Sequence, residues 1–178
     1  MIASLALPVT VPSPAGELRL RGAREADLGA LMGLMSDDAV SRSRGDVASP
    51  EDEDAYRAAL LALMQDPANA LIVAELGGAE EGGETGIVAT FQLTLIPGMA
   101  RRGATRLLVE AVRVSSSVRS GGIGGALMRW VMESATQLTG AELVQLTSDV
   151  RRPDAHRFYE RLGFTGSHVG FKYRIPQE

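Results

Sequence analysis

Val118–Leu127 reads VRSGGIGGAL and lies between a strand-like stretch and a helix-like stretch. The preceding run, Leu107–Val114 (LLVEAVRV), is rich in aliphatic and β-branched residues, which predicts a mostly buried strand. The following run carries apolar residues at helical spacing, namely Ile123, Leu127, Trp130, Val131 and Leu138. A glycine-rich turn between a strand and a helix directs backbone N–H groups and the positive end of a helix dipole at one point. We therefore predict a site for an oxyanion such as a pyrophosphate.

Two well-known phosphate loops do not fit these letters. A Walker loop needs a lysine, and the stretch contains none. A dinucleotide-binding GxGxxG pattern is met at Gly122 and Gly124 but has Leu127 in place of the last glycine. What remains is R-x-x-G-x-G, formed by Arg119, Gly122 and Gly124. This segment resembles the acyl-CoA pyrophosphate loop of the GNAT superfamily of N-acetyltransferases.

A second motif follows at the distance that this family requires. Pro153–Phe164 reads PDAHRFYERLGF and resembles the family's A-x-x-F-Y-x-x-x-G-F segment. The matching residues are Ala155, Phe158, Tyr159, Gly163 and Phe164. The pattern predicts a helix that begins near Pro153 and ends at Gly163. The resemblance covers roughly residues 17–175.

Composition limits the class of protein. A chain of 178 residues is long enough for one domain with a sizeable core, and its net charge of −4 argues against nucleic acid as the main partner. The sequence has no cysteine, which excludes disulfides, a cysteine nucleophile and cysteine-based metal sites. No apolar run approaches the roughly 20 residues that span a bilayer, and the start lacks a basic segment typical of a signal peptide. A cytoplasmic location is expected, with no membrane partner and no metal.

The hydrophobic pattern predicts one domain. Residues 1–15 are expected to form a flexible tail and residues 16–178 a single N-acetyltransferase domain. Expected strands cover 17–21, 71–76, 87–96, 107–114, 142–148 and 169–175, with a turn at 77–84; expected helices cover 24–35, a segment from Pro50, the segment after the glycine loop and a segment from Pro153. This order predicts an α/β fold with a mixed, mostly antiparallel twisted sheet of six to seven strands and about four helices. It is also the order of the GNAT fold.

The resemblance implies how acetyl-CoA, the co-substrate, would be held. The pyrophosphate would lie on the backbone of the loop and the first helical turn: Arg119, Ser120, Gly121, Gly122, Ile123, Gly124 and Gly125. The pantetheine arm would pair with Val112, Arg113 and Val114, where this strand splays from the next. Many members have glycine at the position of Ser120. The alternative for the loop is a tight strand–helix turn that binds no ligand.

Two residues are candidates for proton transfer. The resemblance implies Tyr159 as the general acid; the alternative is an amphipathic aromatic residue that packs on the sheet. Glu110 interrupts an apolar strand, where burial would be costly and would raise the pKa of its carboxyl, as suits a general base. Several family members have glutamate at the corresponding place. The alternatives for Glu110 are an ion pair with Arg113 or Arg106, or an edge-facing carboxylate.

The resemblance implies an N-acetyltransferase that moves an acetyl group from acetyl-CoA to a primary amine by direct attack in a ternary complex. One alternative is a GNAT-like module that binds acyl-CoA with little transfer; another is transfer of a longer acyl group or to a non-amine acceptor. The acceptor is expected to be a small-molecule amine or a protein amine. The mixed charges of Ser36–Pro50, the segment that helps to roof the acceptor site in the family, favour no class of acceptor. A homodimer is left open.

Overall fold

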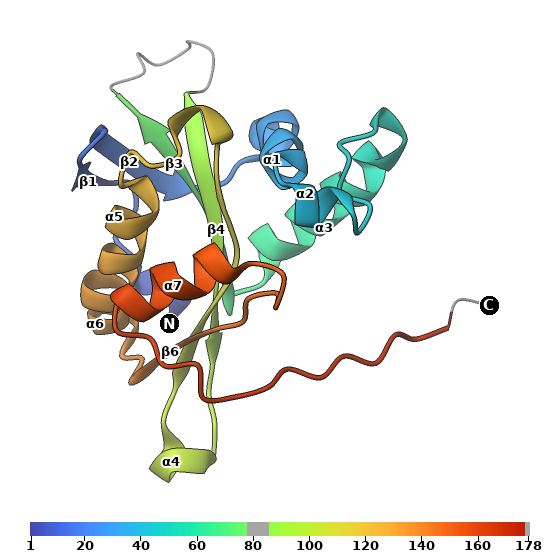
Figure 1. Cartoon of the computed structure of the whole chain (residues 1–178). Coiled ribbons are helices and arrows are strands. Elements are labelled where there is room, and N and C mark those ends of the chain that lie inside the picture. The colour runs from blue at the N-terminus through green and yellow to red at the C-terminus, as the bar shows by residue number, and fades with distance from the viewer. Residues whose placement is uncertain (78–85, 177–178) are drawn as a thin grey trace. The chain divides into compact units, whose positions relative to one another are not determined.

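The computed structural model describes residues 1–77 and 86–176 (Figure 1). These residues fall into two compact units, Met1–Leu146 and Thr147–Glu178, which are described separately. The turn predicted at 77–84 lies outside the described residues except for Gly77. A single domain over 16–178 therefore stays a prediction.

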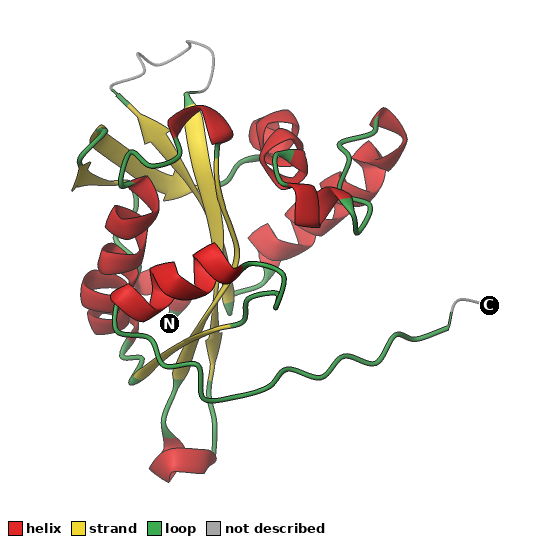
Figure 2. Ribbon diagram, viewed as in Figure 1, coloured by secondary structure: helices red, strands yellow, loops and turns green. Residues whose placement is uncertain are grey.

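The first unit contains a six-stranded sheet in which sequence order and spatial order coincide (Figure 2). The strands are β1 (Val9–Ser13), β2 (Gly16–Gly22), β3 (Asn69–Leu76), β4 (Ile87–Ile96), β5 (Arg106–Val114) and β6 (Leu143–Leu146). Neighbours pair antiparallel from β1 to β5, whereas β5 and β6 are parallel. This arrangement confirms the predicted mixed, mostly antiparallel sheet.

Helices connect these strands. They are α1 (Leu28–Ser36), α2 (Ala39–Arg42), α3 (Glu53–Gln65), α4 (Ala100–Gly103), α5 (Ile123–Trp130) and α6 (Thr136–Thr139), with a π-helical turn at Val131–Ala135 between the last two. Short 3₁₀ turns, η1 (Ile2–Ser4), η2 (Glu25–Asp27), η3 (Pro50–Asp52) and η4 (Ser116–Val118), precede strands or helices. The start of η3 and α3 is as predicted, because the Ser49 hydroxyl accepts the Glu51 N–H and Pro50 occupies the first turn.

The two faces of the sheet have separate cores because side chains alternate along each strand. Val73 of β3 packs in a cluster with residues of α1 and α3, namely Leu28, Leu31, Met32 and Leu60. Its neighbour Ile72 pairs with Phe91 of β4, whose ring meets the edge of Trp130 in α5 at a centroid distance of 6.1 Å. Figure 1 accordingly shows α1–α3 and α5 on opposite sides of the sheet.

The N-terminal residues are part of the fold, so the predicted flexible tail is wrong. β1 pairs along its whole length with β2, from Val9 opposite Leu20 to Ser13 opposite Gly16. Ile2, in η1, is also buried. Pro12, within β1, is compatible with an edge strand, where a missing N–H donor can face solvent.

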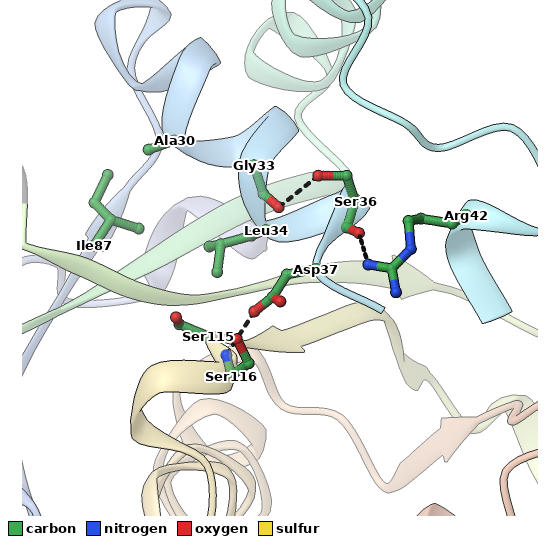
Figure 3. A pocket seen from close by; sticks show the side chains of 9 residues that line it. All are labelled: Ala30, Gly33, Leu34, Ser36, Asp37, Arg42, Ile87, Ser115 and Ser116. Atoms are coloured by element: carbon green, nitrogen blue, oxygen red, sulfur yellow. Dashed lines mark hydrogen bonds between the residues drawn. The ribbon is translucent and has the colours of Figure 1, made fainter. Parts of the chain in front are cut away.

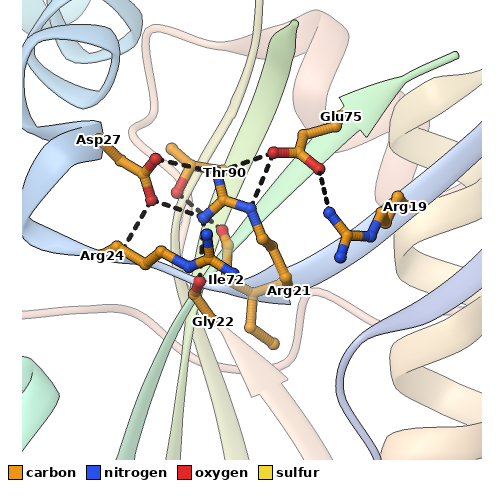
Figure 4. Close-up of polar contacts among 8 residues, drawn as sticks. All are labelled: Arg19, Arg21, Gly22, Arg24, Asp27, Ile72, Glu75 and Thr90. Carbon is orange, nitrogen blue, oxygen red and sulfur yellow. Dashed lines mark hydrogen bonds and ion pairs between the residues drawn. The ribbon is translucent and has the colours of Figure 1, made fainter. Parts of the chain in front are cut away.

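A buried charge network joins β2, η2 and β3 (Figure 4). Arg21 donates from Nη1 to Asp27 Oδ2 at 2.7 Å and from Nε to Glu75 Oε1 at 2.8 Å. Each of these three residues is less than 10% exposed. Burial alone would raise the pKa of Asp27, but the hydrogen bonds from Arg21 and from the Arg24 N–H hold this pKa below its usual value. Asp27 is therefore charged at neutral pH.

The second unit contains helix α7 (Pro153–Arg161). Gly163, at φ 92°, follows the helix and donates its N–H to the Glu160 carbonyl at 2.9 Å, which is the predicted helix end. Residues 164–176 form no helix or strand in the described part of the chain, so the closing strand predicted at 169–175 is wrong. The alternating apolar side chains of this segment are exposed: Val169, Phe171, Tyr173 and Ile175.

Candidate functional site

The glycine loop presents backbone amides at the start of α5. The first helical hydrogen bond runs from the Ala126 N–H to the Gly122 carbonyl, at 3.0 Å. The amides of Ile123–Gly125 precede this bond and therefore have no acceptor within the helix. They lie at the positive end of the helix dipole, so the loop suits an oxyanion ligand.

Two properties of this loop require glycine: close packing against neighbouring residues and a positive φ angle. Gly122 has φ 74°, and a Cβ atom there would lie 2.6 Å from Pro14 Cγ. A Cβ atom on Gly121 would lie 3.2 Å from Ala15 Cβ. The turn between β1 and β2 thus packs against the loop. Ser120, the position at which many family members have glycine, has φ 69° and is held in a conformation that favours glycine.

β5, the strand before the loop, extends past its pairing with β6. The pairing of β5 with β6 ends at Val109, whereas β5 continues to Val114. The Ser115 N–H donates to the Val88 carbonyl, on the β4 side, at 2.8 Å. Backbone N–H groups alternate between the two edges of a strand, so the N–H groups of Val112 and Val114 face away from β4, on the β6 side. The carbonyls on this edge accept from Arg113 and Arg119. Pairing of Val112–Val114 with a ligand arm, which the resemblance implies, stays a prediction.

A β-bulge lies in the middle of this strand. The register between β4 and β5 shifts between the pairs Thr90–Arg113 and Gln92–Glu110. Ala111, within the bulge, has φ 51°. Bulges bend the strand and turn side chains, and they are common next to active sites. The bulge separates Glu110 from Val112.

Glu110 is exposed, so its predicted burial in the apolar strand is wrong. The adjacent Val109 is 1% exposed, and Glu110 lies on the opposite face of the strand. Of the proposed ion-pair partners, Arg106 donates to Gln145 Oε1 at 3.2 Å. A catalytic role for Glu110 stays a prediction.

Arg119, the first residue of the motif, contacts protein groups with its side chain. Its Nε donates to the Val114 carbonyl at 3.1 Å, and its Nη2 donates to the Asp37 carbonyl. The same nitrogen lies 3.6 Å from the Asp37 carboxylate. That carboxylate accepts the Ser116 N–H at 2.5 Å. The Arg119 guanidinium therefore links the glycine loop to the end of β5 and to Asp37.

Arg113 makes a second connection to the same region. It donates from Nη1 to the Val112 carbonyl at 2.9 Å and from Nη2 to the Ser41 hydroxyl at 2.8 Å. Ser41 is fully buried, and its N–H is bound by the Asp38 carboxylate, which caps α2. Asp37 and Ser41 were not identified from the sequence, because 79 and 72 residues separate them from their partners.

A cavity of about 470 Å³ opens where the end of α1 meets the end of β5 (Figure 3). Asp37 and Arg42 line it from the α1–α2 side, and Ser115 and Ser116 from the β5 side. Arg42 donates to the Ser36 carbonyl at 2.8 Å. The cavity therefore has one acidic and one basic group, both already held by hydrogen bonds.

Tyr159 lies in α7 of the second unit. Its ring meets the rings of Phe158 and Phe164 edge to face, at centroid distances of 5.1 Å and 5.8 Å. The ring is half-buried. The ring therefore packs within the second unit. Packing on the sheet and the catalytic role both stay predictions.

Among residues 1–77 and 86–176, histidine, cysteine and acidic side chains form no group of three that could hold a metal ion. In the same ranges, no helix is both long enough and apolar enough to cross a bilayer.

Comparison with known proteins matches residues 35–164 to the family model described as the acetyltransferase (GNAT) family. A curated relative, the aminoalkylphosphonate N-acetyltransferase of Salmonella typhimurium strain LT2, is 41% identical over 63 residues. That match spans 35% of this chain and 40% of the relative.

Solved structures with the same fold are also similar over most of this chain. A protein from Bacillus halodurans C-125, described as a transcriptional regulator, is 36% identical with a TM-score of 0.78; the match covers 89% of this chain and 99% of that one. AAC(6')-Iy, solved with a CoA-containing bisubstrate analogue, is 15% identical with a TM-score of 0.64, over 90% of this chain and 99% of its own. The latter likeness shows the fold alone.

Proposed function

Because the chain belongs to the acetyltransferase (GNAT) family, we propose that it transfers an acetyl group from acetyl-CoA to a primary amine in the cytoplasm. One observation carries this proposal. The amides of Ile123–Gly125 and the part of β5 that extends past β6 lie at the two ends of one short segment, within the matched region. The loop amides would bind the diphosphate of acetyl-CoA, and the β5 edge would pair with its amide-bearing pantetheine arm.

Each part of the site has a proposed role. The loop from Arg119 to Gly125 would hold the pyrophosphate through its backbone, and Val112–Val114 would pair with the pantetheine arm. The thioester supplies an activated acetyl group, and holding it at the bulge would place it for attack. The amine must lose a proton and the leaving thiolate gain one. We assign the first task to Glu110, acting directly or through water, and the second to Tyr159.

The acceptor is proposed from the curated relative. That enzyme is named for aminoalkylphosphonates, so small amines that also bear an acidic group are the first acceptors to test. The match spans less than half of that relative, and other small amines and protein amines belong in the same panel.

The test is binding followed by turnover. Calorimetry with millimolar CoA should detect binding to the purified chain, and thiol release from acetyl-CoA should rise with at least one amine of the panel. Absence of binding heat would contradict the assignment of the glycine loop. Binding without thiol release for any amine would contradict the transferase assignment.

A second candidate function follows from the relative of highest TM-score reported above. The Bacillus halodurans protein is described as a transcriptional regulator and shares 36% identity over nearly its whole length. An acyl-CoA-binding regulatory module with little transferase activity would share the loop and the β5 edge. Binding without turnover in the same assay would favour this candidate.

Glu110→Gln is expected to lower kcat/KM about tenfold, less than the usual contribution of a general base, because solvent water can replace part of the function of an exposed base. The acidic limb of the pH–rate profile should disappear, since glutamine cannot titrate there. The matched control is Glu17→Gln, an exposed glutamate in β2, which should leave the profile unchanged. An acidic limb that persists in Glu110→Gln would exclude Glu110 as the base.

A further inference from the structure

Two hydrogen-bonded links tie the segment Ser36–Arg42, here called the α1–α2 segment, to β5 and the glycine loop. In the first, the Asp37 carboxylate accepts the Ser116 N–H and lies 3.6 Å from Arg119 Nη2. In the second, the Ser41 hydroxyl accepts from Arg113 Nη2 at 2.8 Å. Both links reach residues that flank the proposed phosphate site.

The Asp37 link lies at the start of η4. Asp37 accepts the Ser116 N–H, and the Ser115 hydroxyl accepts the Ser117 N–H at 3.4 Å. The first two amides of this turn are thus bound by side chains. The hydrogen bond from the Ser116 backbone lowers the pKa of Asp37, so its carboxylate is charged at neutral pH.

Ser120, which follows this turn, has a strained backbone that neighbouring contacts must hold in place. Ser120 has φ 69°, a left-handed conformation that costs energy for any residue other than glycine. A strained residue persists only where flanking contacts hold it. On its N-terminal side, Arg119 is held by the carbonyls of Val114 and Asp37. On its C-terminal side, Gly122 is packed against Pro14.

We propose that Asp37 is a positioning residue for the glycine loop: it fixes Ser116 and Arg119 and so holds the amides of Ile123–Gly125 in the geometry that binds the diphosphate. This inference rests on the proposed function and adds to it a residue outside the loop motif. It also makes the α1–α2 segment part of the coenzyme site, since displacement of Asp37 would release the loop.

The experiment compares Asp37→Ala and Asp37→Asn with the control Asp54→Ala, an exposed acid in the first turn of α3. Two quantities are measured: hydrogen exchange of residues 115–125 without ligand, and the Kd for CoA by calorimetry. Asp37→Ala should speed exchange in this segment and raise the Kd about tenfold, as expected for loss of one charge-assisted hydrogen bond. Asp37→Asn keeps an acceptor oxygen and should restore part of the affinity.

Kinetics separate positioning from catalysis. Asp37→Ala should raise KM for acetyl-CoA while kcat at saturation stays within about twofold of wild type. Unchanged exchange of residues 115–125 in Asp37→Ala would overturn the inference, whether or not the wild type binds CoA. Faster exchange with an unchanged Kd would also overturn it. If Asp37→Ala does not fold, Asp37→Asn decides by the same exchange measurement. Failure of the wild type to bind CoA would instead refute the proposed function.

Discussion

Replacing Tyr159 with phenylalanine is expected to lower kcat by roughly a hundredfold or more, the usual contribution of a general acid. The phenolic proton is the one assigned to the departing thiolate, and phenylalanine cannot supply it. The Kd for acetyl-CoA should stay within about twofold, since the loop amides and the β5 edge are unchanged. Steady-state kinetics and calorimetry on the same preparation measure both quantities.

The substitution should leave the second unit folded. The Tyr159 ring packs edge-on against Phe158 and Phe164, and phenylalanine keeps the same ring. Tyr173→Phe is the matched control, because it removes a hydroxyl from a tyrosine that is 83% exposed. Wild-type turnover in Tyr159→Phe would exclude Tyr159 as the general acid and leave it a packing role alone.

The sequence predicted those helices and strands whose limits are set by neighbouring residues in the chain. β4 covers the predicted range, and the helix ends at Ser49 and Gly163 are where a capping hydroxyl and a left-handed glycine place them. The glycine loop was located for the same reason, because its spacing and its position between a strand and a helix are sequence properties.

The predictions that failed concern partners distant in sequence. The tail prediction for residues 1–15 missed β1 because a five-residue edge strand that contains a proline, Pro12, has weak local signals. The alternation at 169–175 is a strand pattern, but a strand also needs a hydrogen-bonded neighbour, which alternation does not specify. Burial of Glu110 was inferred from apolar neighbours in the sequence, whereas exposure depends on which face of the sheet the residue occupies.

Arg21→Met is expected to cost about 3–5 kcal/mol of unfolding free energy at pH 7, the usual cost of removing one partner of a buried ion pair. The substitution keeps the volume of the aliphatic stem but leaves the carboxylates of Asp27 and Glu75 buried without their cation. Arg19→Met is the matched control: Arg19 also pairs with Glu75, but its side chain is 44% exposed. This change should cost less than about 1 kcal/mol. Urea denaturation of both variants measures the difference.

The pH dependence of this cost follows from the lowered pKa of Asp27. A carboxyl whose pKa is lower in the folded state stabilises the fold above its unfolded pKa, and this contribution is lost as the pH falls through the folded value. In Arg21→Met the Asp27 carboxylate loses that protection and takes up a proton more readily, which relieves the buried charge. The difference in unfolding free energy between wild type and Arg21→Met should therefore be largest at pH 7 and should decrease below about pH 4. A difference that stays constant over this range would show that lost packing, not unpaired charge, causes the destabilisation.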